Sequence, residues 1–359
     1  MTAPRLLPLL LAGTALLASC FSSSTPAPEP AFTTADLAGD WRYAIVLDGV
    51  TVAAGNTIGW RRGGATIDAA GGLTFTSALD SNGGTTPPPA AALAVDANGV
   101  VTGTLASVTD FSGQLNRGKD LMIATSSQTG PSVGLRVWQK VPAGTTFSPA
   151  DLAGTWSYHE VFTGSADGWE HGVAAVNALG GVALSGRTAM TGALPDEPAL
   201  GTLSIDANGW VSLDAIPSWG AFMSPDKSRL VAVQTTDAVA RAYGLNVIVR
   251  TGHASTQADA GGTWAFRLLD SSPTGGTWGR GHFSVTATGA TTVTDQLDST
   301  GDTSTPPPFT LVLAADGTAT ITGLPGIDFH GTLGGDGQLL TASQSFGAGE
   351  GGLILVVRR

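Results

Sequence analysis

Three tryptophans, each followed two positions later by a cationic side chain, come closest in this sequence to a recognisable binding site. They stand in Trp60-Arg61-Arg62-Gly63, Trp169-Glu170-His171-Gly172 and Trp278-Gly279-Arg280-Gly281. Residues i and i+2 of a strand point to the same face, so each indole would lie beside its cation. Such a pair can stack on a sugar ring or hold an anion. The candidate binding rim consists of Trp60, Arg62, Trp169, His171, Trp278 and Arg280.

The same six residues also have a structural interpretation. An indole beside a guanidinium can form a cation–π contact that only stabilises the fold, and the glycine after each cation can mark a bulge. Residues repeated in a repeat protein commonly serve the repeated fold. The sequence leaves both interpretations open.

No catalytic or metal-binding arrangement is apparent. The histidines show no pair at ligand spacing on one element, and a solvated or structurally hydrogen-bonded role is expected for them. They are His159, His171, His253, His282 and His330. No zinc-protease motif is present, and the one Gly-x-Ser-x-Gly match, Gly130-Pro131-Ser132-Val133-Gly134, lies in a β pattern without the helix that a nucleophile elbow needs. The Asp-Ala-Asn-Gly segments at 96–99 and 206–209 offer too few oxygens for Ca²⁺, which takes about six to eight, and suit hairpin turns. We therefore expect no enzymatic activity, no metal and no cofactor.

Landmarks recurring in one order divide most of the chain into three repeats. The repeats open with Gly39-Asp40-Trp41, Gly154-Thr155-Trp156 and Gly262-Thr263-Trp264, and each closes on an apolar run after a Gly-Leu pair. Self-similarity at a fixed period indicates tandem copies of one structural unit. We place the repeats at 33–141, 147–250 and 257–359, separated by short linkers.

The pattern within a repeat is typical of β-strands and tight turns. Asn-Gly and Asp-Gly pairs separate short runs of Val, Ile, Leu and Thr. Such runs predict about eight strands per repeat, which suit an antiparallel meander closed into a small barrel. Trp41 and Tyr43 are two positions apart on the first strand, so both should face the barrel interior.

At their two ends the repeats resemble lipocalin-like and avidin-like barrels, the calycin group. That group opens with Gly-x-Trp on its first strand, and a basic residue of the last strand packs across the tryptophan. The matching pairs here are Trp41 with Lys140, Trp156 with Arg250, and Trp264 with Arg358. The resemblance implies that each repeat closes on itself, with roughly 0.5–1 kcal/mol from each cation–π contact. No family ligand is carried over, because no biotin-binding pattern maps onto these residues.

A six-bladed β-propeller is the alternative fold. Eight strands also make two four-stranded blades, so three repeats would give six blades around one axis. The closing run Ile354-Leu355-Val356-Val357 is apolar on both strand faces, which is typical of a strand buried on both sides. The linkers between the repeats favour separate barrels.

The N-terminus carries the signs of an exported lipoprotein. Arg5 precedes an apolar stretch from Leu6 to Leu17, and Leu17-Ala18-Ser19-Cys20 resembles the bacterial lipobox, whose cysteine carries diacylglycerol. We expect a signal peptide over 1–19 and a lipidated tether over 20–32, rich in Ser and Pro. Phe21, where Asp would favour inner-membrane retention, favours the outer membrane if the bacterium has two membranes.

Composition narrows the function without identifying it. The formal net charge of −11 argues against binding nucleic acid, and Cys20 is the sole cysteine. We expect a bacterial envelope protein, attached to the membrane through the lipid on Cys20, with non-catalytic β modules. These modules would bind a small apolar ligand or a glycan, in a barrel lumen or at the rim. The alternative is a structural or adhesive spacer with no small-molecule ligand.

Overall fold

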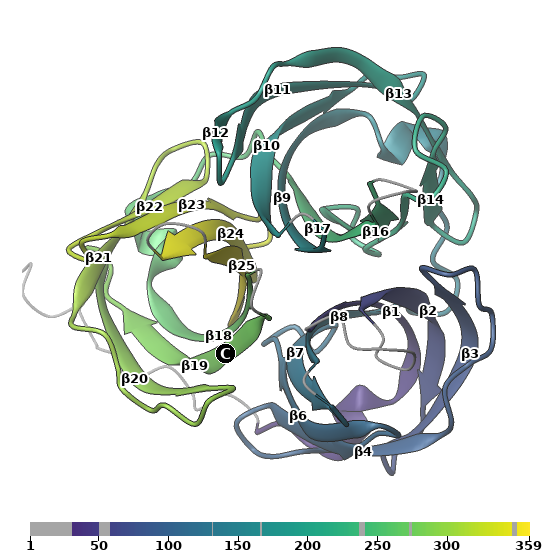
Figure 1. Ribbon diagram of the computed structural model, residues 1–359, viewed down its shortest axis with the longest axis horizontal. Coiled ribbons are helices and arrows are strands. Elements are labelled where there is room, and N and C mark those ends of the chain that lie inside the picture. The colour runs from purple at the N-terminus through teal and green to yellow at the C-terminus, as the bar shows by residue number, and fades with distance from the viewer. Residues whose placement is uncertain are drawn as a thin grey trace, which may run out of the picture. The chain divides into compact units, whose positions relative to one another are not determined.

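Each repeat forms its own closed antiparallel β-barrel in the computed structural model (Figure 1). The structure describes residues 31–49, 58–130, 132–165, 167–236, 241–272, 275–346 and 350–359. Phe32–Arg359 forms one compact unit. The expected signal peptide, Cys20 and the tether up to residue 30 lie outside the described residues.

The eight strands of barrel 1 follow one another around the wall. They are β1 (Gly39–Asp48), β2 (Gly59–Ile67), β3 (Gly72–Asp80), β4 (Ala91–Val95), β5 (Val100–Thr104), β6 (Val108–Leu115), β7 (Leu121–Gln128) and β8 (Val133–Lys140).

Barrel 2 adds a two-residue strand, β12, which pairs only with β11. Its strands are β9 (Gly154–Gly164), β10 (Gly168–Val176), β11 (Gly181–Ala189), β12 (Gly192–Ala193), β13 (Glu197–Ile205), β14 (Trp210–Leu213), β15 (Gly220–Met223), β16 (Arg229–Thr235) and β17 (Ala242–Arg250).

Barrel 3 repeats the plan of barrel 1. Its strands are β18 (Gly262–Ser271), β19 (Thr277–Val285), β20 (Ala290–Asp298), β21 (Phe309–Leu313), β22 (Thr318–Thr322), β23 (Ile327–Leu333), β24 (Leu339–Phe346) and β25 (Gly351–Arg358).

The first strand of every repeat pairs with the last strand of the same repeat. The pairs β1–β8, β9–β17 and β18–β25 are antiparallel, and in each the opening tryptophan lies opposite the closing cation. The prediction of one closed barrel per repeat is therefore confirmed, and the propeller alternative is wrong.

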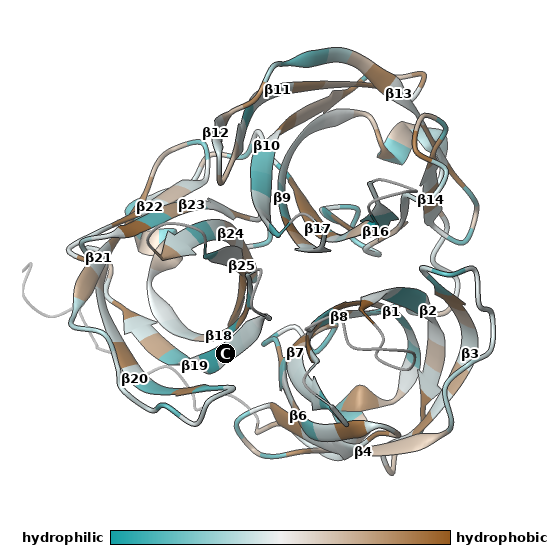
Figure 2. Ribbon diagram, viewed as in Figure 1, coloured by the Kyte–Doolittle hydropathy of each residue, from teal (hydrophilic) through white to brown (hydrophobic). Residues whose placement is uncertain are grey.

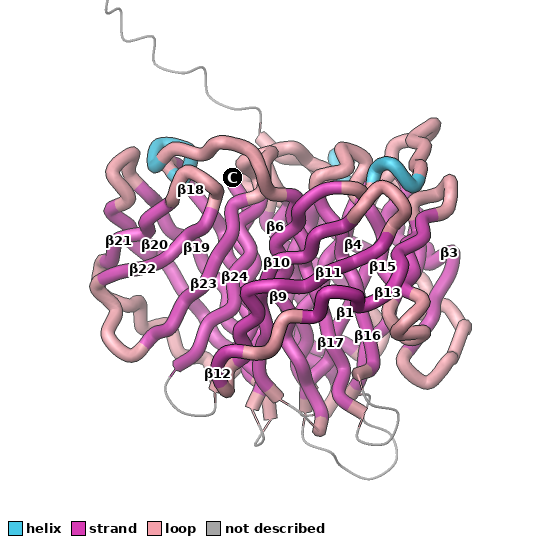
Figure 3. Tube along the Cα trace, turned by 90° about the horizontal axis from the view of Figure 1, so that it is seen from above, coloured by secondary structure: helices cyan, strands magenta, loops and turns pink. Residues whose placement is uncertain are grey.

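A single 3₁₀ turn precedes each barrel. These turns are η1 (Thr34–Leu37), η2 (Pro149–Asp151) and η3 (Gln257–Ala260), and each begins with a reciprocal Ser/Thr–Asp capping box. The first tryptophan of each barrel donates its Nε1 hydrogen to a carbonyl at this turn, over 2.7–2.9 Å. All three turns lie at the same end of the barrels (Figure 3).

Alternate residues of each strand face the barrel interior, and their apolar side chains form one core per barrel. Trp41 and Tyr43 both belong to the interior core of barrel 1. The outer strands carry both apolar and polar residues (Figure 2). In β3, for example, Leu73 and Phe75 are buried and alternate with exposed Thr74 and Thr76.

A fourth apolar core lies between the barrels. It combines outward-facing residues of all three, including Val46 and Leu135 of barrel 1, Val247 of barrel 2, and Leu269 and Leu355 of barrel 3. The first and last strands of each barrel face this shared core (Figure 1). The closing strands are therefore apolar on both faces because one face lines a lumen and the other faces the neighbouring barrels.

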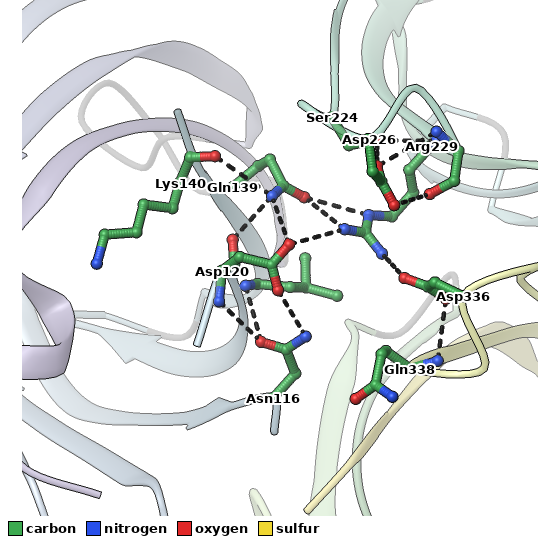
Figure 4. Close-up of polar contacts among 11 residues, drawn as sticks. Asn116, Asp120, Gln139, Lys140, Ser224, Asp226, Arg229, Asp336 and Gln338 are labelled. Carbon is green, nitrogen blue, oxygen red and sulfur yellow. Dashed lines mark hydrogen bonds and ion pairs between the residues drawn. The ribbon is translucent and has the colours of Figure 1, made fainter. Parts of the chain in front are cut away.

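Arg229 of β16 joins all three barrels at one end of the shared core (Figure 4). Its side chain is about 2% exposed. The guanidinium donates to Gln139 Oε1 of barrel 1 at 2.9 and 3.1 Å, and to Asp336 Oδ2 of barrel 3 at 2.8 Å. Asp120 of barrel 1 adds an ion pair at 3.5 Å. One side chain thus ties the three repeats together.

Candidate functional site

The closing cations lie over the opening tryptophans of their barrels. The distance from cation to ring centre is 5.6 Å for Lys140 and Trp41, 4.2 Å for Arg250 and Trp156, and 4.7 Å for Arg358 and Trp264. All three indoles are buried. These pairs close the end of each barrel that carries the 3₁₀ turn, so they shape the lumen without facing an open cavity.

The tryptophans of the candidate rim lie between barrels. Each indole nitrogen donates to a hydroxyl on the last strand but one of a neighbouring barrel, which is β16, β24 or β7. Barrel 1 donates to barrel 2, barrel 2 to barrel 3, and barrel 3 to barrel 1. The pairs are Trp60 with Thr235 (3.0 Å), Trp169 with Ser345 (2.8 Å) and Trp278 with Ser127 (2.9 Å). All three indoles are buried, which corrects the interpretation of an open, ligand-binding rim.

The cations of the candidate rim also face neighbouring barrels. The Arg62 guanidinium lies 5.8 Å from the ring centre of Trp210 in barrel 2. The His171 ring stacks on His330 of barrel 3, with centroids 4.4 Å apart. Arg280 lies 4.4 Å over its own Trp278 and pairs with Asp110 of barrel 1 at 3.0 Å. These side chains make structural contacts between barrels.

Histidines gather where barrels 2 and 3 meet. His159 is buried and hydrogen-bonds to Thr332 at 3.1 Å and Ser343 at 3.3 Å. Burial, with the nearby imidazole of His330, lowers the pKa of His171 to about 4. Within the described ranges, no group of three or more His, Cys, Asp or Glu is arranged to hold a metal ion.

The lumen of barrel 2 contains a cavity of about 730 Å³. Its walls combine one polar patch with mostly apolar surface. The apolar part is formed by Ala174, Val182, Leu184, Leu200, Leu203, Leu213, Ile216, Trp219 and Ile248. Ser218 and Thr236 line the cavity, and both lie at the end of barrel 2 opposite η2. The cavity therefore lies toward that end of the barrel. Its size and its mixed lining are those of small-molecule sites.

Glu160 stands at the centre of the polar patch. On β9 it follows Trp156 and Tyr158 at alternate positions and so faces the lumen, where it is 3% exposed. Gln234 Nε2 donates to its Oε1 at 2.6 Å, and Asn246 Nδ2 lies 3.4 Å from its Oε2. Burial, with the nearby charge of Glu170, raises the pKa of Glu160 to about 8 against these hydrogen bonds.

A second carboxylate in the same lumen is already neutralised. Glu170 accepts from Tyr158 Oη at 2.6 Å and from Arg187 Nε at 3.0 Å. Arg187 also pairs with Glu197. The guanidinium of Arg187 is therefore engaged by two carboxylates, and no ion pair joins Glu160 to a Lys, Arg or His of the described residues.

The other two lumens have different chemistry on the same framework. Barrel 1 has a cavity of about 300 Å³ lined by Arg61 and Arg136, and burial lowers the pKa of Arg136 to about 10. Barrel 3 has a cavity of about 500 Å³ lined mainly by Phe, Leu, Ile and Val. Burial, and then Glu350, raises the pKa of Asp270 in that lumen to about 7. The ionisable residues of the three cavities thus differ. Barrel 1 has two arginines and one aspartate, barrel 2 has three glutamates and two arginines, and barrel 3 has three carboxyl groups among mainly apolar residues.

The raised pKa of Glu160 predicts a pH-dependent stability. The folded value of about 8 exceeds the ordinary value of 4.5, so the folded protein holds this proton more tightly than the unfolded chain. The resulting stabilisation is full below pH 4.5 and is lost as the pH rises through 8. We expect the thermal midpoint to fall between pH 7 and 8, and Glu160→Gln to flatten that fall. An equal slope in the variant would assign the effect to other groups.

Sequence reasoning missed the lumen residues that carry charge. The alternation of Trp156 and Tyr158 already indicated which face of β9 points inward, and Glu160 shares that face. His159 has the structurally hydrogen-bonded role expected for the histidines, through Thr332 and Ser343, and Glu160 beside it is buried in the lumen. The sequence signal that could have identified Glu160 is its spacing, because it follows the interior aromatics Trp156 and Tyr158 at alternate positions on β9.

Comparisons with known proteins give only distant likenesses. No protein-family model and no curated protein matches the chain. Transferrin-binding protein B of serogroup B Neisseria meningitidis is 11% identical, with a TM-score of 0.31 over 92% of this chain and 78% of that one. A Haemophilus parasuis homologue of that name, a double mutant, is 9% identical, with a TM-score of 0.30 over 89% and 76%. A Nostoc punctiforme protein of unknown function is 14% identical, with a TM-score of 0.23 over 59% and 100%.

These TM-scores are too low to assign a family or a ligand. Within the described part of the chain, no helix has the length and apolar character needed to cross a membrane. The chain is an all-β protein built of three fused barrels.

Proposed function

We propose that this is a lipid-anchored protein of the bacterial envelope whose barrel lumens bind small molecules without catalysing a reaction. The anchor rests on Leu17-Ala18-Ser19-Cys20, and Phe21 favours the outer membrane. Barrel 3 would take an apolar ligand. The observation that carries this proposal is the cavity of about 500 Å³ in its lumen.

The lining of barrel 3 supports an apolar ligand. Phe266, Phe283 and Leu340 are buried around the cavity, and Phe329 and Ile354 are partly exposed within it. Burying apolar ligand surface against such walls gains about 25 cal/mol per Å². A glycan ligand is less well supported, because the three tryptophans that were expected to stack on sugar rings are buried between barrels. A pure spacer function would need no cavity of this kind.

Filling the cavity of barrel 3 tests the proposal. We expect the purified protein to bind octan-1-ol saturably in isothermal titration calorimetry. Ile354→Trp places a larger side chain in the lumen and should weaken that binding about tenfold or more, equal to about 1.4 kcal/mol.

The matched control is Val312→Trp, which adds the same indole at a position 41% exposed on β21. It should bind octan-1-ol like the unmodified protein. Absence of saturable binding, or unchanged affinity in Ile354→Trp, would contradict the proposal and favour the spacer alternative.

A further inference from the structure

Barrel 2 differs from its neighbours at one inward-facing position of the first strand. Counting from the opening tryptophan, barrel 1 has Ile45, barrel 3 has Leu268 and barrel 2 has Glu160. The barrel fold therefore does not require a carboxylate there. Burial without a charged partner favours the neutral, protonated form of this carboxyl group, and a bound cation would favour its ionised form.

The surroundings of Glu160 provide hydrogen-bond acceptors that lack donors. Gln234 and Asn246 are each 7% exposed and line the cavity. Their amide nitrogens point to Glu160, while Gln234 Oε1 and Asn246 Oδ1 are buried without a hydrogen-bond partner. Buried acceptors without donors are rare in folded proteins. A ligand that supplies N–H donors would satisfy them.

Carboxyl groups outnumber guanidinium groups in the lining of the cavity, by three to two. Glu160, Glu170 and Glu197 line it, and Arg187 pairs with the second and third of these. Tyr158 donates to Glu170, and burial together with that carboxylate raises the pKa of its hydroxyl, so it stays neutral. Arg241 and Tyr243 also line the cavity, and the Arg241 side chain is exposed and donates to Asn82 of barrel 1 at 3.1 Å. Glu160 is therefore the one carboxyl group of this lumen that has no ion pair within the described part of the chain.

We propose that the lumen of barrel 2 is a binding site for a primary amine with an apolar body, whose ammonium group pairs with Glu160 and donates to Gln234 and Asn246. An ammonium group has three N–H donors and no acceptor, which matches one carboxylate and two amide oxygens. The apolar body would lie against Val182, Leu203 and Ile248. This proposal rests on the function proposed above and deepens it, because it gives the lumen of barrel 2 a ligand class different from that of barrel 3.

Amine binding is coupled to proton release. In the empty lumen burial favours the protonated form of Glu160, and an ammonium group would favour the ionised form. The carboxyl proton would pass to solvent as the amine binds. An alkylamine, like a lysine side chain with a pKa of about 10.4, stays cationic up to pH 8. Affinity for the amine should therefore rise between pH 6 and pH 8.

Titration of the full protein with octylamine tests this site. We expect saturable binding at pH 8, weaker binding at pH 6, and proton release detected by calorimetry in buffers of different ionisation enthalpy. Octanoate, with an alkyl chain one carbon shorter and the opposite charge, should bind at least tenfold more weakly than octylamine. No octylamine binding at pH 8, or octanoate binding equally well, would overturn the proposal.

Substitutions locate the site. Glu160→Gln keeps the shape of the side chain and should weaken octylamine at least tenfold. Glu160→Leu copies barrel 3 and gives a second, apolar variant with the same expected loss. Asp151→Asn, a matched loss of a carboxylate that pairs with Lys227 at η2 and does not line the cavity, should stay within about threefold of the unmodified protein. Equal octylamine affinity in the Glu160 variants and the unmodified protein would overturn the proposal.

The proposals for barrel 2 and barrel 3 can be disproved independently of each other. Loss of octan-1-ol binding in Ile354→Trp concerns barrel 3 alone, and loss of octylamine binding in Glu160→Gln concerns barrel 2 alone. Octylamine binding that depends on Ile354 and not on Glu160 would place the amine in barrel 3 and overturn the proposal for barrel 2.

Discussion

Replacing Trp278 by alanine should lower the free energy of unfolding by about 3–5 kcal/mol, the range for removing a large buried aromatic side chain. Trp278 is 3% exposed and belongs to the core shared by the three barrels. Its indole donates to Ser127 of barrel 1, and Arg280 stacks on its ring while pairing with Asp110. Urea denaturation followed by circular dichroism measures the loss.

Trp278→Phe separates packing from hydrogen bonding. Phenylalanine keeps most of the apolar contact and loses only the donor to Ser127, so about 1 kcal/mol should be lost. Trp60→Ala and Trp169→Ala, at the equivalent contacts, should resemble Trp278→Ala. A loss below 1 kcal/mol in Trp278→Ala would show that the indole does not help to hold barrel 3 against barrel 1.

Replacing Arg229 by alanine should cost about 3–5 kcal/mol, as expected when one partner of a buried ionic network is removed. The substitution removes both hydrogen bonds that the guanidinium donates to Gln139 Oε1. It also removes the hydrogen bond and ion pair between Arg229 and Asp336. The midpoint of urea unfolding gives the effect. Lys227→Ala is the control, because its pair with Asp151 lies within barrel 2 and is more exposed.

A double substitution should restore much of this stability. Arg229 lies opposite Val249 in its barrel, where barrel 1 has Leu121 opposite Gln139 and barrel 3 has Leu339 opposite Val357. Arg229→Leu with Gln139→Val would give all three barrels the same apolar pair. Well-packed apolar groups often replace a buried ionic group without loss. A double variant no more stable than Arg229→Ala would show that the network itself is needed.

The fold was predictable to the level of one barrel because its signals are local. The meander was predicted from strand alternation and turn residues, and its interior face from the spacing of Trp41 and Tyr43. All of these signals depend only on neighbours in the sequence. What lies outside each barrel was not predictable. The run from Ile354 to Val357 showed that both faces are buried, but not that the outer face meets other barrels.

The candidate site was the least predictable part. Trp60 and Arg62 share a strand face, as their spacing indicated, but their partners Thr235 and Trp210 are far along the chain, on barrel 2. A cavity depends on the summed volumes of side chains from eight strands, and no local pattern reports that sum. The amides of Gln234 and Asn246 that contact Glu160 are 74 and 86 positions away in the sequence, so no local pattern marks this site.

The ring of barrels is closed within one polypeptide, and this has a consequence for how its pockets can diversify. In a homotrimer of single barrels, each point mutation in the gene alters three lumens at once, and dilution separates the subunits. Here the linkers keep the barrels at high effective concentration, and each copy mutates independently. Ile45, Glu160 and Leu268 occupy equivalent positions in the three barrels, so a single chain can carry three different lumens in fixed proportion.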